Sequence, residues 1–257
     1  WNSLISGYVQ NGQPELAMDC FLQMQNEGIT PDSITVTCIL KACGMLGSVE
    51  RGAEIHALID EKGLVQQDVI LGNALVNMYC KFGLLGKAHE ILEQLPRRNT
   101  ASWSALISGY AHHGRGDEAL RCFRSMQKEG IPPDSVSFIC ILKACGSLRS
   151  LGVGEEIHGE IKRQGLLDKD IVLGTALVDM YAKCGALKEA HKVLLGLPRR
   201  NVVSWSAVIA GYVENRFGDE MLKCFRQMHA EGSCPNTVTC TSVLKACAMA
   251  RCLAYAG

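Results

Sequence analysis

The chain has 257 residues, 47% of them hydrophobic, and its 26 basic residues balance 26 acidic residues at a formal net charge of zero. This balance excludes bulk electrostatic attraction to nucleic acid or to an anionic membrane, so any such binding must use local side chains. No apolar run of the sequence approaches the ~20 residues of a membrane-spanning helix, and we expect no membrane partner.

The first 32 residues predict a helical hairpin. Apolar residues recur at helical spacing from Trp1 to Tyr8 and again from Ala17 to Met24. Pro14 is placed to start the second helix, and Gly28 is placed to cap its end. The same pattern continues through the chain, and no strand-like alternation competes with it. We therefore predict an all-α solenoid of helix-turn-helix repeats.

Tryptophan marks a longer period in this pattern. Trp1, Trp103 and Trp205 are the three tryptophans, and they begin the closely related segments WNSLISGY, WSALISGY and WSAVIAGY. Hairpins of three unequal lengths fill each interval, so the 257 residues predict one array. We number its repeats 1 to 8: residues 1–32, 33–68, 69–99, 100–134, 135–170, 171–201, 202–236 and 237–257.

The 13 cysteines follow the repeat as well. Two sets recur beside apolar residues at helical spacing, namely Cys20, Cys122 and Cys224, and Cys43, Cys145 and Cys247. This placement predicts small, buried, reduced thiols rather than a disulfide framework. The sequence contains no C-x-x-C pair, so we expect no zinc site, and nothing else in it indicates a cofactor.

The motifs themselves resemble a known family. WSALISGYAHHGRGDEALRCFRSMQKEGIPPD closely resembles a pentatricopeptide repeat (PPR). The cycle of lengths resembles the plant PLS subclass, in which P, L and S motifs alternate. ILKACGSLRSLGVGEEIHGEIKRQGL is similar to its L motif and TALVDMYAKCGALKEAHKVLLGLPRRN to its S motif. Repeats 1, 4 and 7 would be P motifs, repeats 2, 5 and 8 L motifs, and repeats 3 and 6 S motifs. Repeats 1 and 8 are truncated.

This resemblance implies a right-handed superhelix that binds single-stranded organellar RNA, with one nucleotide read per repeat. It also implies a role as a site-recognition factor for C-to-U editing in a mitochondrion or chloroplast. Editing cofactor proteins would be further partners, and no small-molecule substrate is expected. We predict no enzyme activity within these residues, because no nucleophile–base set occurs. His158-Gly159-Glu160 mimics a deaminase H-x-E but lacks the P-C-x-x-C that should follow. The chain begins inside a repeat without Met, so we expect a longer protein in which a C-terminal deaminase-like domain has a place.

In this family the specificity pair is the residue after the Trp/Tyr position of the first helix (the fifth of a full repeat) and the last residue of the repeat. The family's code assigns U, a pyrimidine, G, A and A to the five pairs carried over. Repeats 2 and 5 depart from the code at Thr37 and Ile139, so the hypothetical target is U-N-Y-G-N-A-A-N. The pairs are Asn2–Asp32, Asn73–Asn99, Ser104–Asp134, Thr175–Asn201 and Ser206–Asn236.

Two further sets follow from the resemblance. Second-position residues would sandwich the base, and a lysine of repeats 3 and 6 would contact phosphate. The pairs and these two sets each have a structural alternative. Asp and Asn at the ends of repeats commonly cap helices, apolar second-position residues commonly pack inside hairpins, and lysines are commonly solvated surface charges. Arg97-Arg98 and Arg199-Arg200 could touch phosphate or lie in exposed loops. The predicted sandwich residues are Ile34, Ile70, Val136, Val172 and Val203, and the predicted phosphate contacts are Lys81 and Lys183.

A protein–protein scaffold is the rival function, because tetratricopeptide (TPR) repeats are also helical hairpins of similar length. The neutral net charge of the chain favours such a scaffold. The unequal repeat lengths and the recurring polar pairs favour the RNA-binding interpretation instead.

Overall fold

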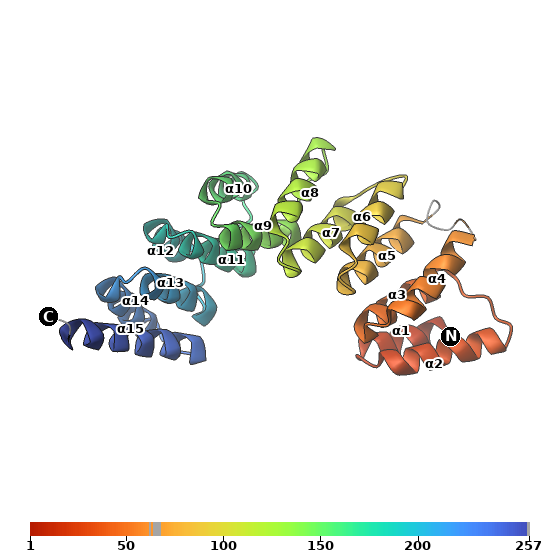
Figure 1. The fold of residues 1–257 in the computed structure, drawn as a ribbon, viewed down its shortest axis with the longest axis horizontal. Coiled ribbons are helices and arrows are strands. Elements are labelled where there is room, and N and C mark those ends of the chain that lie inside the picture. Colours follow the sequence, from red (N-terminus) through yellow and green to blue (C-terminus); the bar gives the residue numbers. More distant parts are fainter. Residues whose placement is uncertain (62, 64–67, 256–257) are drawn as a thin grey trace. The chain divides into compact units, whose positions relative to one another are not determined.

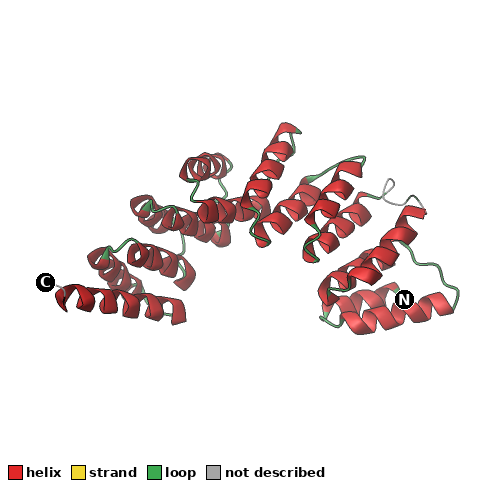
Figure 2. Ribbon diagram, in the orientation of Figure 1, coloured by secondary structure: helices red, strands yellow, loops and turns green. Residues whose placement is uncertain are grey.

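The fold comes from a computed structural model that describes residues 1–61, 63 and 68–255 (Figure 1). Predictions for residues 62, 64–67 and 256–257 lie outside this range, as do the side chains of Cys247 and residues 249–255. Within the described part, helices form all the regular structure (Figure 2), which confirms the all-α prediction. The helices are α1 Asn2–Gln10, α2 Pro14–Asn26, α3 Ser33–Leu46, α4 Val49–Glu61, α5 Val69–Lys81, α6 Leu85–Gln94, α7 Thr100–His112, α8 Gly116–Lys128, α9 Ser135–Leu148, α10 Leu151–Arg163, α11 Ile171–Lys183, α12 Leu187–Gly196, α13 Val202–Glu214, α14 Gly218–Ala230 and α15 Thr237–Tyr255.

Each repeat from 1 to 7 contributes two consecutive helices, a first helix of odd number and a second helix of even number. From repeat 2 onward, the first helix begins at the first residue of the repeat, as at Ser33, Val69 and Thr100. Repeats 3 and 6 are the short ones because their second helices, α6 and α12, have 10 residues where α8 and α14 have 13. The difference in repeat length therefore lies in the second helix.

The chain divides into two compact units, residues 1–137 and 138–257. In the first unit, α1, α3, α5 and α7 contact one another in sequence, and each also contacts the second helix of its own hairpin. In the second unit, α11, α13 and α15 contact one another in sequence, with α12 and α14 packed beside their hairpin partners. Within each unit, stacking of neighbouring repeats buries a continuous core.

Small residues set the spacing between neighbouring first helices. Gly211 on α13 faces the preceding hairpin so closely that an added Cβ would lie 2.9 Å from Leu187 Cδ2 and 3.0 Å from Ala182 Cβ. On α7, a Cβ added to Gly109 would likewise lie too close to the Cys80 side chain on α5. Such contacts leave no room for a side chain, so the first helices lie at a close and recurring separation.

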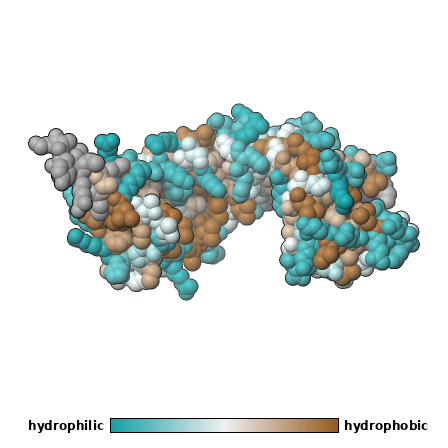
Figure 3. Space-filling model, turned by 60° about the horizontal axis from the view of Figure 1, so that its bottom comes forward, coloured by the Kyte–Doolittle hydropathy of each residue, from teal (hydrophilic) through white to brown (hydrophobic). Residues whose placement is uncertain are grey.

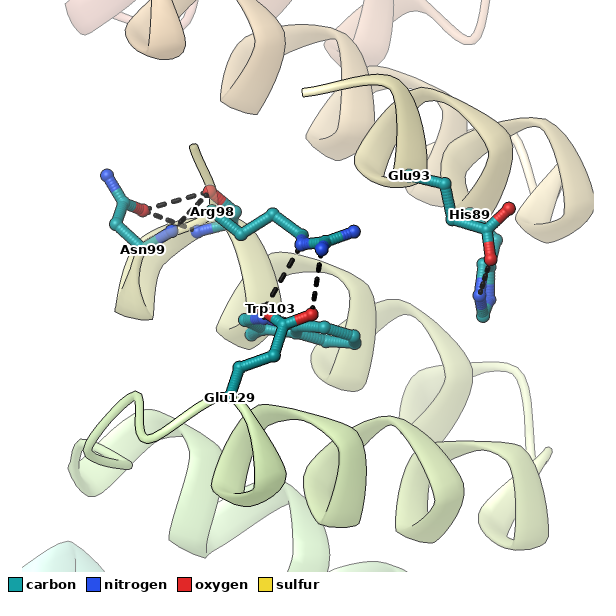
Figure 4. Close-up of polar contacts among 7 residues, drawn as sticks. His89, Glu93, Arg98, Asn99, Trp103 and Glu129 are labelled. Atoms are coloured by element: carbon teal, nitrogen blue, oxygen red, sulfur yellow. Dashed lines mark hydrogen bonds and ion pairs between the residues drawn. The ribbon is translucent and has the colours of Figure 1, made fainter. Parts of the chain in front are cut away.

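An ion pair and an indole join repeats 3 and 4. The Arg98 guanidinium reaches Glu129 at 2.9 Å, and the indole N–H of Trp103 donates to the same carboxylate at 3.1 Å (Figure 4). Trp103 is buried, as is Trp205, so both pack in the core. Arg200 pairs with Glu231 at 2.7 Å in the second unit. Arg98 and Arg200 lie in loops, as predicted, and are only partly exposed because each is paired with a glutamate; Arg97 and Arg199 in the same loops are exposed.

Most of the described cysteines are buried. Burial raises the pKa of the Cys80 and Cys122 thiols to about 12, and that of Cys43 and Cys224 to about 11. A thiol with such a pKa is protonated and a poor nucleophile at neutral pH. Cys43, Cys122, Cys145 and Cys224 are buried packing residues, as predicted, whereas Cys20 is only partly buried.

Candidate nucleic-acid interface

The second-position residues of the repeats lie at the protein surface. Their relative exposure ranges from 51% at Val136 to 68% at Ile70. The face shown in Figure 3 carries hydrophobic patches among its hydrophilic side chains. The alternative that these residues pack inside hairpins is therefore wrong. The predicted set consists of Ile34, Ile70, Val136, Val172 and Val203, and Val238 is exposed in the same way.

Four of the five predicted pairs are joined by a side-chain hydrogen bond, although their members lie 26 to 30 residues apart. In the fifth, Thr175 donates its hydroxyl to the Ile171 carbonyl at 2.8 Å. The structure therefore brings the two members of four predicted pairs together. The joined pairs are Asn2 Nδ2 to Asp32 Oδ2 at 2.7 Å, Asn73 Nδ2 to Asn99 Oδ1 at 3.4 Å, Ser104 Oγ to Asp134 Oδ1 at 2.9 Å, and Ser206 Oγ to Asn236 Oδ1 at 3.2 Å.

The last residue of each of these repeats also caps the next helix. Asp134 Oδ1 accepts the backbone N–H of Ser137 at 2.8 Å, and Asn99 Oδ1 accepts that of Ser102 at 2.9 Å. A backbone N–H can only donate, so the atom turned toward it must be an oxygen. The side chain's other atom is then Oδ2 in Asp134, an acceptor, and Nδ2 in Asn99, a donor. Capping therefore fixes which atom remains for a ligand.

A buried hydroxyl completes each of these sites, and the prediction missed it. The hydroxyl belongs to the third residue of the following repeat, and this residue has a relative exposure of 0%. The sequence could have indicated this hydroxyl, because serine or threonine recurs at these third positions in each three-repeat cycle. The missed residues are Thr35, Ser102, Ser137, Ser204 and Thr239.

Repeats 2 and 5 end differently. Asp68 and Asp170 cap α5 and α11 with ψ angles of 101° and 99°, whereas Asp32 and Asn99 have ψ angles of 177° and 178°. The third residue of the following repeat is here a leucine, Leu71 or Leu173, with no hydroxyl. Together with Thr37 and Ile139 at the fifth positions, this makes the ends of repeats 2 and 5 a distinct kind of site.

Asp32 is held in its ionised form. The backbone N–H of Thr35 is the main cause that lowers the pKa of this carboxyl below its usual value, and the amide of Asn2 adds to the effect. Hydrogen bonds donated to a carboxylate stabilise its charged state. Asp32 is therefore an acceptor at neutral pH.

A groove lies between α3 and α5, the first helices of repeats 2 and 3. We call the surface formed by the first helices the first-helix face. The groove, of about 410 Å³, brings together Ile70, Asn73 and Lys81, three residues predicted for three different roles. Thr37, Leu40 and Lys41 line its other side. Ile70, Asn73 and Lys81 share one face of α5 because they lie at helical spacing. A base, its pairing edge and a backbone phosphate could be contacted along this one helix.

The H-x-E resemblance at His158 has a structural explanation. His158 Nδ1 lies 2.9 Å from the Tyr181 hydroxyl, and His56 makes the same contact with Tyr79. These histidines join a second helix to the next first helix. In the described part of the chain, no cluster of three or more His, Cys, Asp or Glu residues could hold a metal ion. None of the described helices is long and apolar enough to cross a membrane.

The fold and the site define an all-helical repeat protein that presents polar pairs at several of its first helices. A model of the PPR repeat family matches residues 1–45, 98–147 and 200–249, and a PPR repeat model matches residues 73–100 and 175–202. These matches cover well over half of the chain, and the chain belongs to the pentatricopeptide repeat family.

Curated relatives from Arabidopsis thaliana share the whole array. Pentatricopeptide repeat-containing protein At2g33680 is 36% identical over 96% of this chain and 34% of its own length. The chloroplastic At1g11290 protein is 39% identical over 96% of this chain and 30% of its own length. The mitochondrial At3g09040 protein is 36% identical over 96% of this chain and 24% of its own length. The chain thus spans about a third or less of the length of these relatives.

Solved structures show the same fold. The pentatricopeptide repeat protein PPR10 in complex with an 18-nt psaJ RNA element superposes with a TM-score of 0.79 at 25% identity, over 94% of this chain and 36% of that chain. PPR10 from maize gives a TM-score of 0.57 at 17% identity, over 96% of this chain and 46% of that chain.

Proposed function

We propose that this chain binds single-stranded RNA and reads its sequence with the polar pairs of the first-helix face. The observation that carries the proposal is the hydrogen-bonded pairing of fifth and last residues across separate helices, as in Ser104 and Asp134. Exposed apolar residues such as Val172 lie beside these pairs and offer a surface for base stacking. The RNA complex of PPR10, similar to this chain over 94% of its length, supports the proposal.

The capping geometry gives the proposed code a physical basis. An outward carboxylate oxygen, as on Asp134, accepts the ring N–H that guanine and uracil carry on their pairing edges. An outward amide, as on Asn99 or Asn236, donates to the ring nitrogen that adenine and cytosine offer as an acceptor. The last residue thereby separates G and U from A and C, and the fifth residue then separates purine from pyrimidine.

The proposed target follows from this code. With repeat 1 toward the 5′ end, the order is U-N-Y-G-N-A-A-N, where N marks the nucleotides of repeats 2, 5 and 8. Ser104 and Ser206 are only 5% exposed, so the last residue is the more accessible member of each of their pairs. We expect Asp134 and Asn236 to make the main base contacts at the fourth and seventh nucleotides.

The biological role is also part of the proposal. Relatives are named chloroplastic or mitochondrial, which supports an organellar RNA as the ligand. We assign the three-repeat cycle to the PLS subclass and propose that the protein selects sites for C-to-U editing. Catalysis would then reside outside these residues, in a further domain or in a partner protein.

Binding to synthetic RNA tests the function. The chain, extended by its natural flanks, is titrated with RNAs that carry U-N-Y-G-N-A-A-N and with scrambled RNAs of the same composition. We expect tighter binding of the matched RNA by at least about tenfold, since mismatches at several bases accumulate. Equal affinities would disprove the code assignment. Partner capture that survives ribonuclease treatment, in a chain that binds no RNA, would instead establish the scaffold function.

A further inference from the structure

The buried third-position hydroxyl of Ser137 lies within hydrogen-bond distance of both members of the pair of repeat 4. Asp134 Oδ1 accepts from the Ser137 hydroxyl at 2.7 Å and from the Ser104 hydroxyl at 2.9 Å, and the two hydroxyl oxygens are 2.7 Å apart. The Ser137 backbone N–H reaches the same oxygen at 2.8 Å. Ser137 is completely buried, so it cannot contact RNA itself.

Three donors converge on Asp134 Oδ1, which leaves that oxygen little capacity for another bond. The inner oxygen is therefore occupied by the protein, and Oδ2 is the acceptor available to a base. The Ser137 hydroxyl is the one member of this set that neither belongs to the pair nor is needed to cap α9. This hydroxyl fixes the orientation of the Asp134 carboxylate.

The equivalent hydroxyl at repeat 3, that of Ser102, orients an amide of the pair. The Ser102 hydroxyl lies 2.6 Å from Asn73 Oδ1 and 2.9 Å from Asn99 Oδ1. The backbone N–H of Ser102 already selects Asn99 Oδ1, so the single hydroxyl hydrogen, donated to Asn73 Oδ1, fixes the orientation of the Asn73 amide. Without that donor, rotation of Asn73 by a half turn would exchange its donor and acceptor atoms. The hydroxyl thus decides which pattern the pair shows to a base.

Two other sites provide internal contrasts. After repeats 2 and 5 the third residue is Leu71 or Leu173, and there the fifth residue is Thr37 or Ile139. At repeat 6, the Ser204 hydroxyl donates to the backbone carbonyl of Asn201 at 2.9 Å rather than to the pair's side chains. The bridging hydroxyl therefore occurs at repeats 1, 3, 4 and 7, where the pair is joined by a side-chain hydrogen bond.

We propose that the buried third-position hydroxyls of Thr35, Ser102, Ser137 and Thr239 are positioning residues that determine base specificity for the preceding pair. The proposal rests on the function proposed above and extends the reading site from two residues to three. Each hydroxyl acts through the pair and never touches the RNA. Sequence specificity at one nucleotide is thereby set in part by the following repeat.

Substitution of Ser137 tests this proposal. The Ser137→Ala variant loses the hydroxyl but keeps the backbone N–H that Asp134 caps, so α9 retains its cap. We expect the preference for G over A at the fourth nucleotide to fall by about fivefold, in keeping with the net contribution of one typical hydrogen bond. The preference for A over G at the seventh nucleotide should stay unchanged. Ser137→Thr should preserve specificity, because Thr35 and Thr239 occupy the equivalent positions.

A second variant keeps the proposal testable if Ser137→Ala fails to fold. Thr239→Val preserves the side-chain shape and removes the hydroxyl that contacts Ser206 at 3.0 Å and Asn236 at 2.7 Å. It should reduce the preference for A over G at the seventh nucleotide alone. Ser204→Ala serves as the comparison and should change specificity at the sixth nucleotide less.

The outcomes separate the two proposals. If wild-type protein discriminates between nucleotides and Ser137→Ala retains its full G-over-A ratio, the positioning role is overturned while RNA recognition stands. An equal loss at the fourth and seventh nucleotides would also overturn it, because a general structural defect has no preferred nucleotide. If the wild-type protein shows no discrimination anywhere, both proposals are overturned.

Discussion

The ammonium group of Lys183 lies 2.7 Å from the carboxylate of Asp179, one turn earlier on α11. The equivalent lysine on α5, Lys81, is preceded at that position by Asn77, which carries no charge. The two lysines predicted to contact phosphate therefore differ in their electrostatic surroundings. A phosphate that approaches Lys183 must compete with Asp179, whereas one that approaches Lys81 meets no carboxylate at residue 77.

Exchange of these two residues should change RNA affinity in opposite directions. Asp179→Asn frees Lys183 and should tighten binding by about two- to fivefold, as expected for an exposed ion pair worth up to ~1 kcal/mol. Asn77→Asp should weaken binding by a similar factor. Titrations at several salt concentrations check this, because an added phosphate contact steepens the salt dependence by about 0.7. An unchanged salt dependence of RNA affinity in both variants would show that Lys81 and Lys183 do not contact phosphate.

The exposed apolar residues should matter for binding but little for stability. Val172→Ala removes a side chain that is 64% exposed, so the free energy of unfolding should change by less than about 0.5 kcal/mol. RNA affinity should fall by about fivefold or more, because base stacking is worth about 1 kcal/mol or more. Leu177→Ala on the same helix is the matched control, since this residue is fully buried and its loss should cost about 2–5 kcal/mol. Full RNA affinity in Val172→Ala would contradict the sandwich role.

The Glu129 carboxylate should stabilise the junction of repeats 3 and 4. Glu129→Ala removes the ion pair with Arg98 and leaves the buried indole N–H of Trp103 without its acceptor, at a cost of about 1–3 kcal/mol. Glu231→Ala should cost less, because the described structure shows no partner for the indole nitrogen of Trp205 to lose. Denaturant unfolding of both variants measures the difference. Equal costs would show that the indole bond contributes nothing.

Acidification should destabilise the fold through its half-buried histidines. Burial lowers the pKa of His158 below its usual value of 6.5, and Lys162 and Lys192 lower it further. The folded state then binds fewer protons than the unfolded chain, so this contribution to stability is complete above pH 6.5 and is lost as the pH falls through the folded pKa. The melting temperature should drop below pH 6.5, and less so in His158→Gln. An identical pH profile for the variant and the wild type would exclude His158 as the cause.

Much of the fold was predictable because the repeat expresses local rules several times. Pro14 and the apolar stripe after it specify a helix from nearby residues alone, and the first helices begin where the periodicity places them. Exposure was harder to infer. A period of 3.6 assigns Val172 to a face but does not say whether another helix covers that face.

The missed parts of the site depend on partners distant in sequence. Ser137 lies 33 residues from Ser104, and Arg98 lies 31 residues from Glu129. A serine near a helix start is commonplace, so its type alone does not indicate a bridge between two side chains. Its recurrence with the three-repeat cycle was the available signal, and only the packed structure shows what it contacts.

A reciprocal exchange of Asp134 and Asn236 tests the central claim most directly. Both residues pair with a serine on the first helix of their repeat, so the exchange changes one outward atom at each site. Asn236→Asp should move the preference at the seventh nucleotide from A to G, and Asp134→Asn should move the preference at the fourth nucleotide from G to A. Affinities for the four RNAs that combine G or A at these two nucleotides measure both effects. The account predicts that each variant reverses its own nucleotide and leaves the other unchanged; variants that keep the wild-type order of affinities would contradict it.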